Sequence, residues 1–210
     1  MNKEQLETAL KKAYEDKGKR KFPQSVELIV NFRWIDFSKP ENRLNLDIVL
    51  PKGKGSKQPK VAIIADENIA ATAKKASPEL VIAPNDIASY AEISKLKMLA
   101  REYVLLCQPN LMGQVAKSLG QYLGPRGKLP KPLVGNAADL VEKARKSVRI
   151  VSKGKYLPVA QALVGTEEMD VKDVFENAES VYDTIKAKVT EPNIKSLYVK
   201  MTMGKPVKVG

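Results

Sequence analysis

Residues 60–83 read KVAIIADENIAATAKKASPELVIA, and this stretch decides the fold of the middle of the chain. A short apolar run at 61–65 is followed by a helical pattern at 67–76 and a second apolar run at 80–83. The alternation continues with a helix expected at 88–103, a strand at 104–107, a helix at 111–122 and, after a Gly- and Pro-rich stretch, a helix at 137–147. Such alternation is typical of βαβ units, so we expect a parallel sheet.

The front of the chain carries a different pattern. Leu6 and Leu10 belong to an apolar stripe at helical spacing, which predicts an opening helix. Apolar residues at every second position of 26–31 and 44–50 then predict two strands, although Ile29 and Val49 also occur in the alternate sets. This style is typical of an antiparallel sheet with one face open to solvent.

The back of the chain returns to the antiparallel style. Strands are expected at 148–152 and 156–163, and Lys153-Gly-Lys155 between them suggests a hairpin turn. An amphipathic helix follows at 171–185. In a last strand, the alternation places two sets of side chains on opposite sides: Leu197, Val199, Met201 and Met203 on one, and Tyr198, Lys200 and Thr202 on the other.

Neither end of the chain alone has enough strands and helices to bury a sheet face. We therefore expect a discontinuous two-layer α+β domain made of residues 1–53 and 147–210, with residues 54–146 inserted as a second α/β domain. Two connections, near 50–60 and 145–150, would join the domains and allow hinge motion.

Charge points to a polyanionic partner. The 210 residues carry 36 bases against 24 acids, a net charge of +12 and a sequence pI near 9.6. The three blocks 1–53, 54–146 and 147–210 have +3, +7 and +2, which attracts nucleic acid at physiological salt. The chain has no apolar run of about 18 residues and no apolar leader, so we expect a cytoplasmic protein without a membrane partner.

Several patterns argue against an enzyme. The chain has no histidine, no phosphate-loop motif and no GxGxxG fingerprint after a strand. The acids between Asp170 and Glu179 resemble a solvated helix face more than an acid/base or metal pair. Cys107, the single cysteine, lies in an apolar run and is expected to be a small buried side chain. We expect no cofactor and no metal; an enzyme that uses the α/β domain is the disfavoured alternative.

Two short stretches can meet RNA. Residues 123–132 read LGPRGKLPKP, where Gly124 and Gly127 permit close backbone approach and Arg126, Lys128 and Lys131 can meet phosphates. A purely structural loop is the equal alternative. The last strand ends at Gly204, which could let RNA approach the backbone, although a bare amphipathic strand explains the same pattern.

Four motifs occur together in this order: KFPQSVE at 21–27, NRLN at 42–45 leading to LPKG at 50–53, LGPRGKLP at 123–130 and TMG at 202–204. Together they resemble the ribosomal protein L-one family, the first protein of the large ribosomal subunit, in its archaeal form. The resemblance spans nearly the whole chain. It implies a first domain formed by both chain ends and an inserted, Rossmann-like, three-layer α/β domain.

The resemblance also implies a function. Members bind a helical element of large-subunit ribosomal RNA, form the mobile stalk beside the tRNA exit site and repress translation of their own messenger RNA. The expected partners of this chain are therefore large-subunit ribosomal RNA, its own mRNA and exit-site tRNA, for a protein that is a monomer off the ribosome. An RNA-binding repressor that acts away from the ribosome is the alternative.

The resemblance assigns RNA contacts residue by residue. Phe22 would offer an apolar plane, Ser25 and Thr202 hydroxyl groups, and Gly204 a bare backbone. The full set that the resemblance implies is Lys21, Phe22, Ser25, Glu27, Gln161, Thr202, Met203, Gly204 and Lys205. The family reads Thr-Met-Gly-Pro, whereas Lys205 stands before Pro206 here. Basic residues of the 123–132 loop would meet tRNA or other phosphates.

Overall fold

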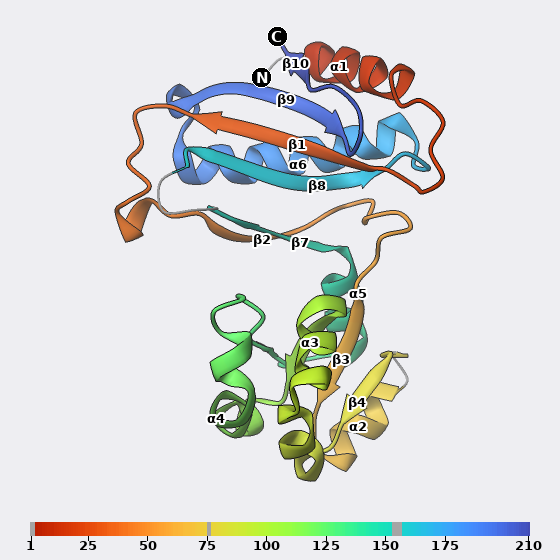
Figure 1. The fold of residues 1–210 in the computed structure, drawn as a ribbon, viewed down its shortest axis with the longest axis vertical. Helices are drawn as coiled ribbons and strands as arrows, with labels where there is room; N and C mark the ends of the chain where they lie inside the picture. Colours follow the sequence, from red (N-terminus) through yellow and green to blue (C-terminus); the bar gives the residue numbers. More distant parts are fainter. Residues whose placement is uncertain (1–2, 75–76, 153–156) are drawn as a thin grey trace. The chain divides into compact units, whose positions relative to one another are not determined.

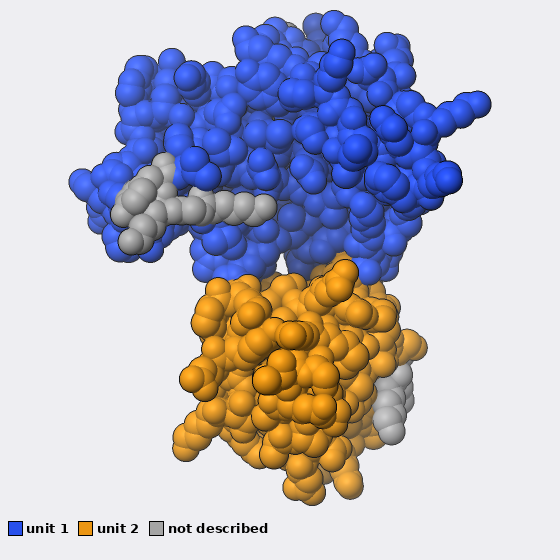
Figure 2. Space-filling view, viewed as in Figure 1, with its two compact units in different colours: residues 1–58, 146–210 blue, residues 59–145 orange. Residues whose placement is uncertain are grey.

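The computed structural model describes residues 3–74, 77–152 and 157–210. The chain divides into two compact units, coloured separately in Figure 2: unit 1 consists of residues 1–58 and 146–210, and unit 2 of residues 59–145. With these limits, unit 1 carries 24 bases and 16 acids, and unit 2 carries 12 and 8. Lys54, Lys57 and Lys146 fall in unit 1, so most of the positive excess belongs to that unit and not to the middle of the chain.

Unit 2 is built on a parallel sheet with the strand order β4-β3-β5-β6. Its strands are β3 (Lys60–Ile64), β4 (Leu80–Ile82), β5 (Tyr103–Cys107) and β6 (Lys131–Pro132), and its helices are α2 (Glu67–Lys74), α3 (Ile93–Glu102), α4 (Met112–Leu123) and α5 (Ala137–Lys146). Consecutive β3 residues point to opposite faces, so that Ala62 and Ile64 pack in one apolar cluster and Val61 and Ile63 in another. The three-layer α/β arrangement follows from these two cores.

Unit 1 contains an antiparallel sheet with the strand order β10-β9-β1-β8. The strands are β1 (Ser25–Phe32), β8 (Val159–Thr166), β9 (Ile194–Met201) and β10 (Val207–Val209), and the helices are α1 (Lys3–Glu15) and α6 (Val171–Val189). Strands from both chain ends lie side by side in this sheet (Figure 1).

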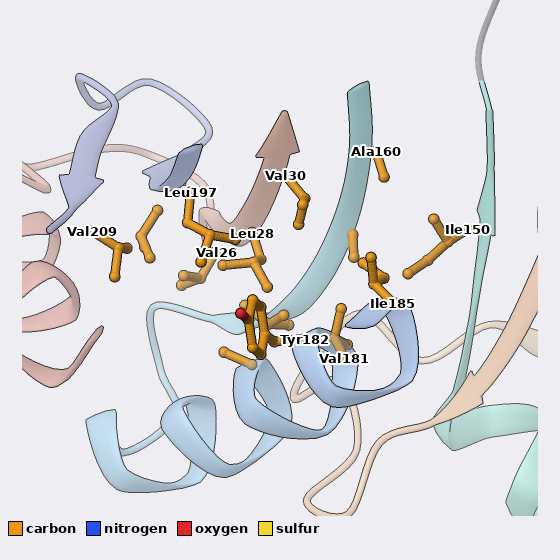
Figure 3. Packing of buried hydrophobic residues seen from close by; sticks show 14 of the residues in the cluster. Val26, Leu28, Val30, Ile150, Ala160, Val181, Tyr182, Ile185, Leu197 and Val209 are labelled. Carbon is orange, nitrogen blue, oxygen red and sulfur yellow. The ribbon is translucent and has the colours of Figure 1, made fainter. Parts of the chain in front are cut away.

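Alternation along β1 buries one face of this sheet. Val26, Leu28 and Val30 point into a core that also contains Tyr182 and Ile185 of α6 (Figure 3). The residues between them, such as Glu27 and Ile29, lie on the other face and are partly exposed. Both helices, α1 and α6, pack against the buried face of the sheet. Unit 1 therefore has two layers and one open sheet face. The expected α/β class, with antiparallel pairing in the unit formed by both chain ends and a parallel sheet in the other, is confirmed.

The expected hairpin around Lys153 is wrong. Strand β7 (Ser147–Val151) pairs with β2 (Asn45–Val49) in a separate two-stranded sheet, whereas β8 pairs with β1. Burial explains the choice, because Ile48 of β2 and Ile150 of β7 both contribute to the apolar core of unit 1. The Lys153-Gly-Lys155 turn itself lies outside the described residues.

Other differences concern element ends. The expected helix at 88–103 is divided into a 3-10 helix, η2 (Pro84–Ala91), and α3. Strands β6 and β10, both very short, were not expected. Three further 3-10 turns, η1 (Pro40–Asn42), η3 (Pro109–Leu111) and η4 (Glu191–Asn193), carry proline in their first positions. No helix in the described part of the chain is long and apolar enough to cross a membrane.

Candidate nucleic-acid interface

The start of β1 and the turn after β9 are joined by hydrogen bonds. Ser25 N donates to Thr202 Oγ1 at 3.0 Å, and Thr202 N donates to Ser25 O at 3.1 Å. The Thr202 hydroxyl also lies 3.4 Å from Ser25 O. Two residues 177 positions apart in the sequence are therefore held side by side at one end of the sheet, although the hydroxyl of Thr202 already has a partner within the protein.

Gln24 also holds this turn, residues 202–204, which we call the pinned turn. Its side chain is fully buried, and its Oε1 accepts from Met203 N at 3.0 Å. Its Nε2 donates to Lys17 O at 2.7 Å and to Glu167 Oε2 at 3.1 Å. A buried amide with all these partners costs little to bury and positions three segments at once. Gln24 thus orients the backbone that carries Met203 and Gly204.

Apolar and basic side chains close in sequence to Ser25 and to the pinned turn are exposed. Phe22 is 45% exposed and Met203 is 59% exposed. Lys21, which precedes Phe22, and Lys205, two residues after Met203, are also exposed. The expected alternation stops before Thr202 and Met203: β9 ends at Met201, and the bond from Gly204 N to Met201 O at 3.1 Å closes a tight turn. This group of residues offers an aromatic plane beside positive charge.

The open face of the sheet continues the surface. Glu27 lies opposite Lys200 of β9 in the strand register, and Lys200 Nζ donates to Thr202 O at 3.0 Å. Gln161 of β8 is exposed and pairs with Ile29, four residues along β1 from Ser25. That offset corresponds to about 13 Å at the rise of a strand. The structure therefore gathers Ser25, Thr202 and Glu27 at one end, with Gln161 farther along the sheet.

Three residues that the motif comparison did not assign contact the candidate residues: Gln24, Lys200 and Lys57. Lys57 Nζ donates to Ser25 Oγ at 2.6 Å, and Ser25 itself is only 8% exposed. The quoted motif KFPQSVE includes Gln24, so a polar residue between two assigned positions was the available signal. No local pattern could reveal Lys57, because its contact joins residues 32 positions apart.

The second candidate surface is the loop after α4 in unit 2. Lys128 N donates to Leu123 O and Gly127 N to Gly124 O, which form a turn with Gly127 at a φ of +63°. The guanidinium of Arg126 lies 3.6 Å from the centre of the Tyr122 ring and donates to Tyr122 O at 3.0 Å. Lys131 lies in the short strand β6. Local turns and stacking thus support the tip of the loop, and its end is joined to β5, where Lys131 is the register partner of Leu106.

The remaining candidates have structural explanations. Lys52 Nζ lies 3.4 Å from Asp173 Oδ1 and 3.5 Å from Glu176 Oε2, so these acids of α6 take part in ion pairs. Cys107 is fully buried, as expected, and burial raises the pKa of its thiol to about 11. Among the described residues, no group of three His, Cys, Asp or Glu side chains could hold a metal ion.

Two compact units, one of them formed by both chain ends around a pinned polar turn, define a mixed α/β protein with a discontinuous first domain. Residues 10–205 match the model of the Ribosomal protein L1p/L10e family, and the chain belongs to that family.

Curated relatives agree along nearly the whole chain. The Large ribosomal subunit protein uL1 of Thermofilum pendens is 43% identical over 209 residues, which cover 97% of this chain and 92% of the relative. The protein of the same name from Thermococcus kodakarensis is 40% identical over 99% of this chain and 98% of the relative. That from Methanothermococcus thermolithotrophicus is 38% identical over 100% and 99%. The expected resemblance to the archaeal type is confirmed.

Proposed function

We propose that this chain is a constituent of the large ribosomal subunit and binds large-subunit ribosomal RNA through the pinned turn and open sheet face of unit 1. The observation that carries the proposal is the pairing of Ser25 with Thr202 beside exposed Phe22 and Met203. The names of the relatives support the assignment to the large subunit. The role is structural, and no bond is made or broken.

The chemistry of the surface suits folded RNA. Phe22 offers a face for a sugar or an unstacked base, and the backbone at Gly204 has no side chain to keep RNA away. The positive charges of Lys21, Lys200 and Lys205 attract the phosphate backbone, while Glu27 can accept from a 2′-hydroxyl group. Phosphate contacts position the RNA without reading its sequence, so shape and hydroxyl contacts provide the specificity.

Unit 2 has a separate role in this proposal. Its loop at 124–132 carries Arg126, Lys128 and Lys131, which meet phosphates of exit-site tRNA. The protein is then the movable stalk of the subunit: unit 1 anchors it on ribosomal RNA, and unit 2 reaches tRNA. It works in the cytoplasm, on the ribosome, and is a monomer when free.

Repression of its own messenger RNA uses the same surface of unit 1, because an mRNA that folds like the ribosomal site presents the same groups. An RNA-binding repressor that acts only away from the ribosome is the alternative. Sedimentation of cell extracts separates the two: a ribosomal constituent is recovered with large subunits, whereas a free repressor stays at the top of the gradient.

The test is crosslinking in cells followed by sequencing of the attached RNA, with parent, Phe22→Ala and Trp34→Ala. Trp34 is a matched control, because it is 79% exposed and follows the other end of β1. We expect large-subunit ribosomal RNA as the main product, a loss of about tenfold for Phe22→Ala, in line with the cost of removing one stacking contact, and no loss for Trp34→Ala. Equal recovery from all three proteins would contradict the proposed interface.

A further inference from the structure

The segment that leads out of unit 1 is fixed in a defined path. Residues 52–57, which we call the exit segment, come just before unit 2 begins at residue 59. The fully buried Asn177 of α6 holds its start: Oδ1 accepts from Lys52 N at 2.9 Å, and Nδ2 donates to Gly53 O and Val164 O, each at 2.8 Å. The side-chain amide of Asn177 thus uses its oxygen and its nitrogen in these three hydrogen bonds.

The middle of the exit segment lies against the end of β8. Gly55 has a φ of +65°, a left-handed conformation that favours glycine. A Cβ at this position would collide with the hydroxyl of Thr166, which is itself the register partner of Ser25 in the sheet. The chain therefore passes beside the same sheet end that carries the pinned turn.

The exit segment also places the ammonium group of Lys57 at that end of the sheet. Lys57 Nζ lies 2.6 Å from Ser25 Oγ, and among the described residues no carboxylate lies within ion-pair distance of it. Lys52 differs, since two carboxylates of α6 pair with it. An exposed ammonium group has three donors, and a serine hydroxyl satisfies one of them. The fixed backbone of the exit segment thus places the Lys57 ammonium group on a polar surface.

We propose that Lys57 binds a phosphate of the RNA that docks on unit 1, and that the bound RNA thereby holds the exit segment in place. This inference rests on the proposed function. Lys57 forms the third side of the interface, next to Ser25, while Phe22 and the turn at 202–204 form the other two. RNA occupancy then stiffens the chain at the point where it leaves unit 1.

Filter binding of the full chain to the large-subunit RNA recovered by crosslinking tests the contact, with Lys57→Met, Lys57→Arg and Lys52→Met. Each phosphate contact changes the slope of log affinity against log salt by about one unit, so Lys57→Met should lower the slope by that amount and the affinity by about fivefold near physiological salt. Lys57→Arg should keep the slope. Lys52→Met removes the same charge from the same segment and should keep both quantities.

The outcomes separate this inference from the function on which it rests. If Phe22→Ala weakens binding but Lys57→Met leaves slope and affinity unchanged, the lysine contact is wrong and the interface stands. Equal losses of affinity for Lys57→Met and Lys52→Met would also overturn the lysine contact. Such a result would reflect general electrostatic attraction of RNA by the segment. If no variant, Phe22→Ala included, affects binding, the proposed interface itself is wrong.

Amide hydrogen exchange tests the hold on the exit segment. In the parent protein, RNA should slow exchange of the amides at 54–57, whereas in Lys57→Met the turn at 202–204 should still be protected and the exit segment should not. Equal protection of the exit segment in both proteins would overturn this part of the proposal. Unchanged melting temperatures of the free variants establish that they are folded.

Discussion

The two candidate RNA surfaces differ in what holds them in place. In unit 1, Ser25, Gln24 and Thr202 are fixed by hydrogen bonds between segments more than 140 residues apart in the sequence. In unit 2, Arg126 is fixed by Tyr122, four residues away, and the loop turns on local backbone bonds. A surface that long-range contacts have organised in advance loses little entropy on binding and can be selective. A basic loop with local support is suited to phosphates in general.

The largest expected effect tests the rigidity of the first surface. Gly55→Ala should lower the free energy of unfolding of unit 1 by about 3 kcal/mol, because a Cβ there meets Thr166 and the backbone is left-handed. Gly18→Ala is the matched control: Gly18 has a φ of +60° and no atom within 4 Å of its Cβ position, so the cost should be about 1 kcal/mol. Denaturant unfolding measures both, and equal costs would contradict a tightly packed exit segment.

The next effect concerns the pinned turn. Thr202→Val removes the acceptor of Ser25 N, so it should weaken specific RNA binding by about 1 to 3 kcal/mol and lower stability by about 1 kcal/mol. Thr202→Ser keeps the oxygen and should retain most of both. Filter binding and thermal melting measure the two quantities. A valine variant that binds like the parent would exclude Thr202 from the interface.

A smaller effect is expected in unit 2. Replacement of Lys128 and Lys131 by glutamine should flatten the salt dependence of binding to tRNA or nonspecific RNA by about 1.5 to 2 units and lower affinity by about tenfold near physiological salt. Binding of the specific ribosomal RNA by unit 1 should change little. If the salt slope for tRNA stays that of the parent, the loop has a structural role only.

The smallest effect concerns the stability of unit 1 at alkaline pH. Burial raises the pKa of Tyr14 to about 12, and burial together with the Glu191 carboxylate raises that of Tyr182 to about 12, from an ordinary value of 10.0. A phenol with a higher pKa in the folded state contributes its full stability below pH 10, and this is lost as the pH rises to 12. Unit 1 should therefore lose about 1 kcal/mol per tyrosine near pH 11.

Unfolding at several pH values, with Tyr14→Phe for comparison, checks this expectation. The hydroxyl of Tyr14 lies 3.2 Å from Thr166 O and 3.1 Å from Met169 O, so the variant should be less stable at neutral pH by about 1 kcal/mol but less sensitive to alkali. A parent protein with constant stability up to pH 11 would contradict the raised pKa values of Tyr14 and Tyr182.

Local patterns predicted the elements well where burial repeats regularly. Val26, Leu28 and Val30 alternate into the core as expected, and the βαβ rhythm from 60 to 123 corresponds to the strands and helices of unit 2. The patterns failed where the partner of a segment is distant. Lys153-Gly-Lys155 suggested a hairpin, yet β7 finds its partner in β2, about 100 residues earlier. No neighbouring residue encodes that pairing.

The candidate site divides in the same way. Motif comparison placed Phe22, Ser25 and Thr202 in one surface, and the structure brings Ser25 and Thr202 together. It did not assign Gln24 or Lys57, whose importance depends on hydrogen bonds across the fold. The alternation was extended to Met203, two residues beyond the point where the strand ends. Tertiary contacts, which a linear pattern does not contain, decide these positions.

The order of strands in unit 1 has a consequence for biosynthesis. β1 is made before the other strands of its sheet, and its neighbours β8 and β9 begin at residues 159 and 194, after all of unit 2 has been synthesised. Unit 2 is contiguous, so it can fold during translation while β1 waits as an unpaired strand with two open edges. A nascent chain must therefore keep Ser25–Phe32 out of improper β-pairing until its last residues arrive, and slow release or truncation near the C-terminus would favour aggregation through that strand.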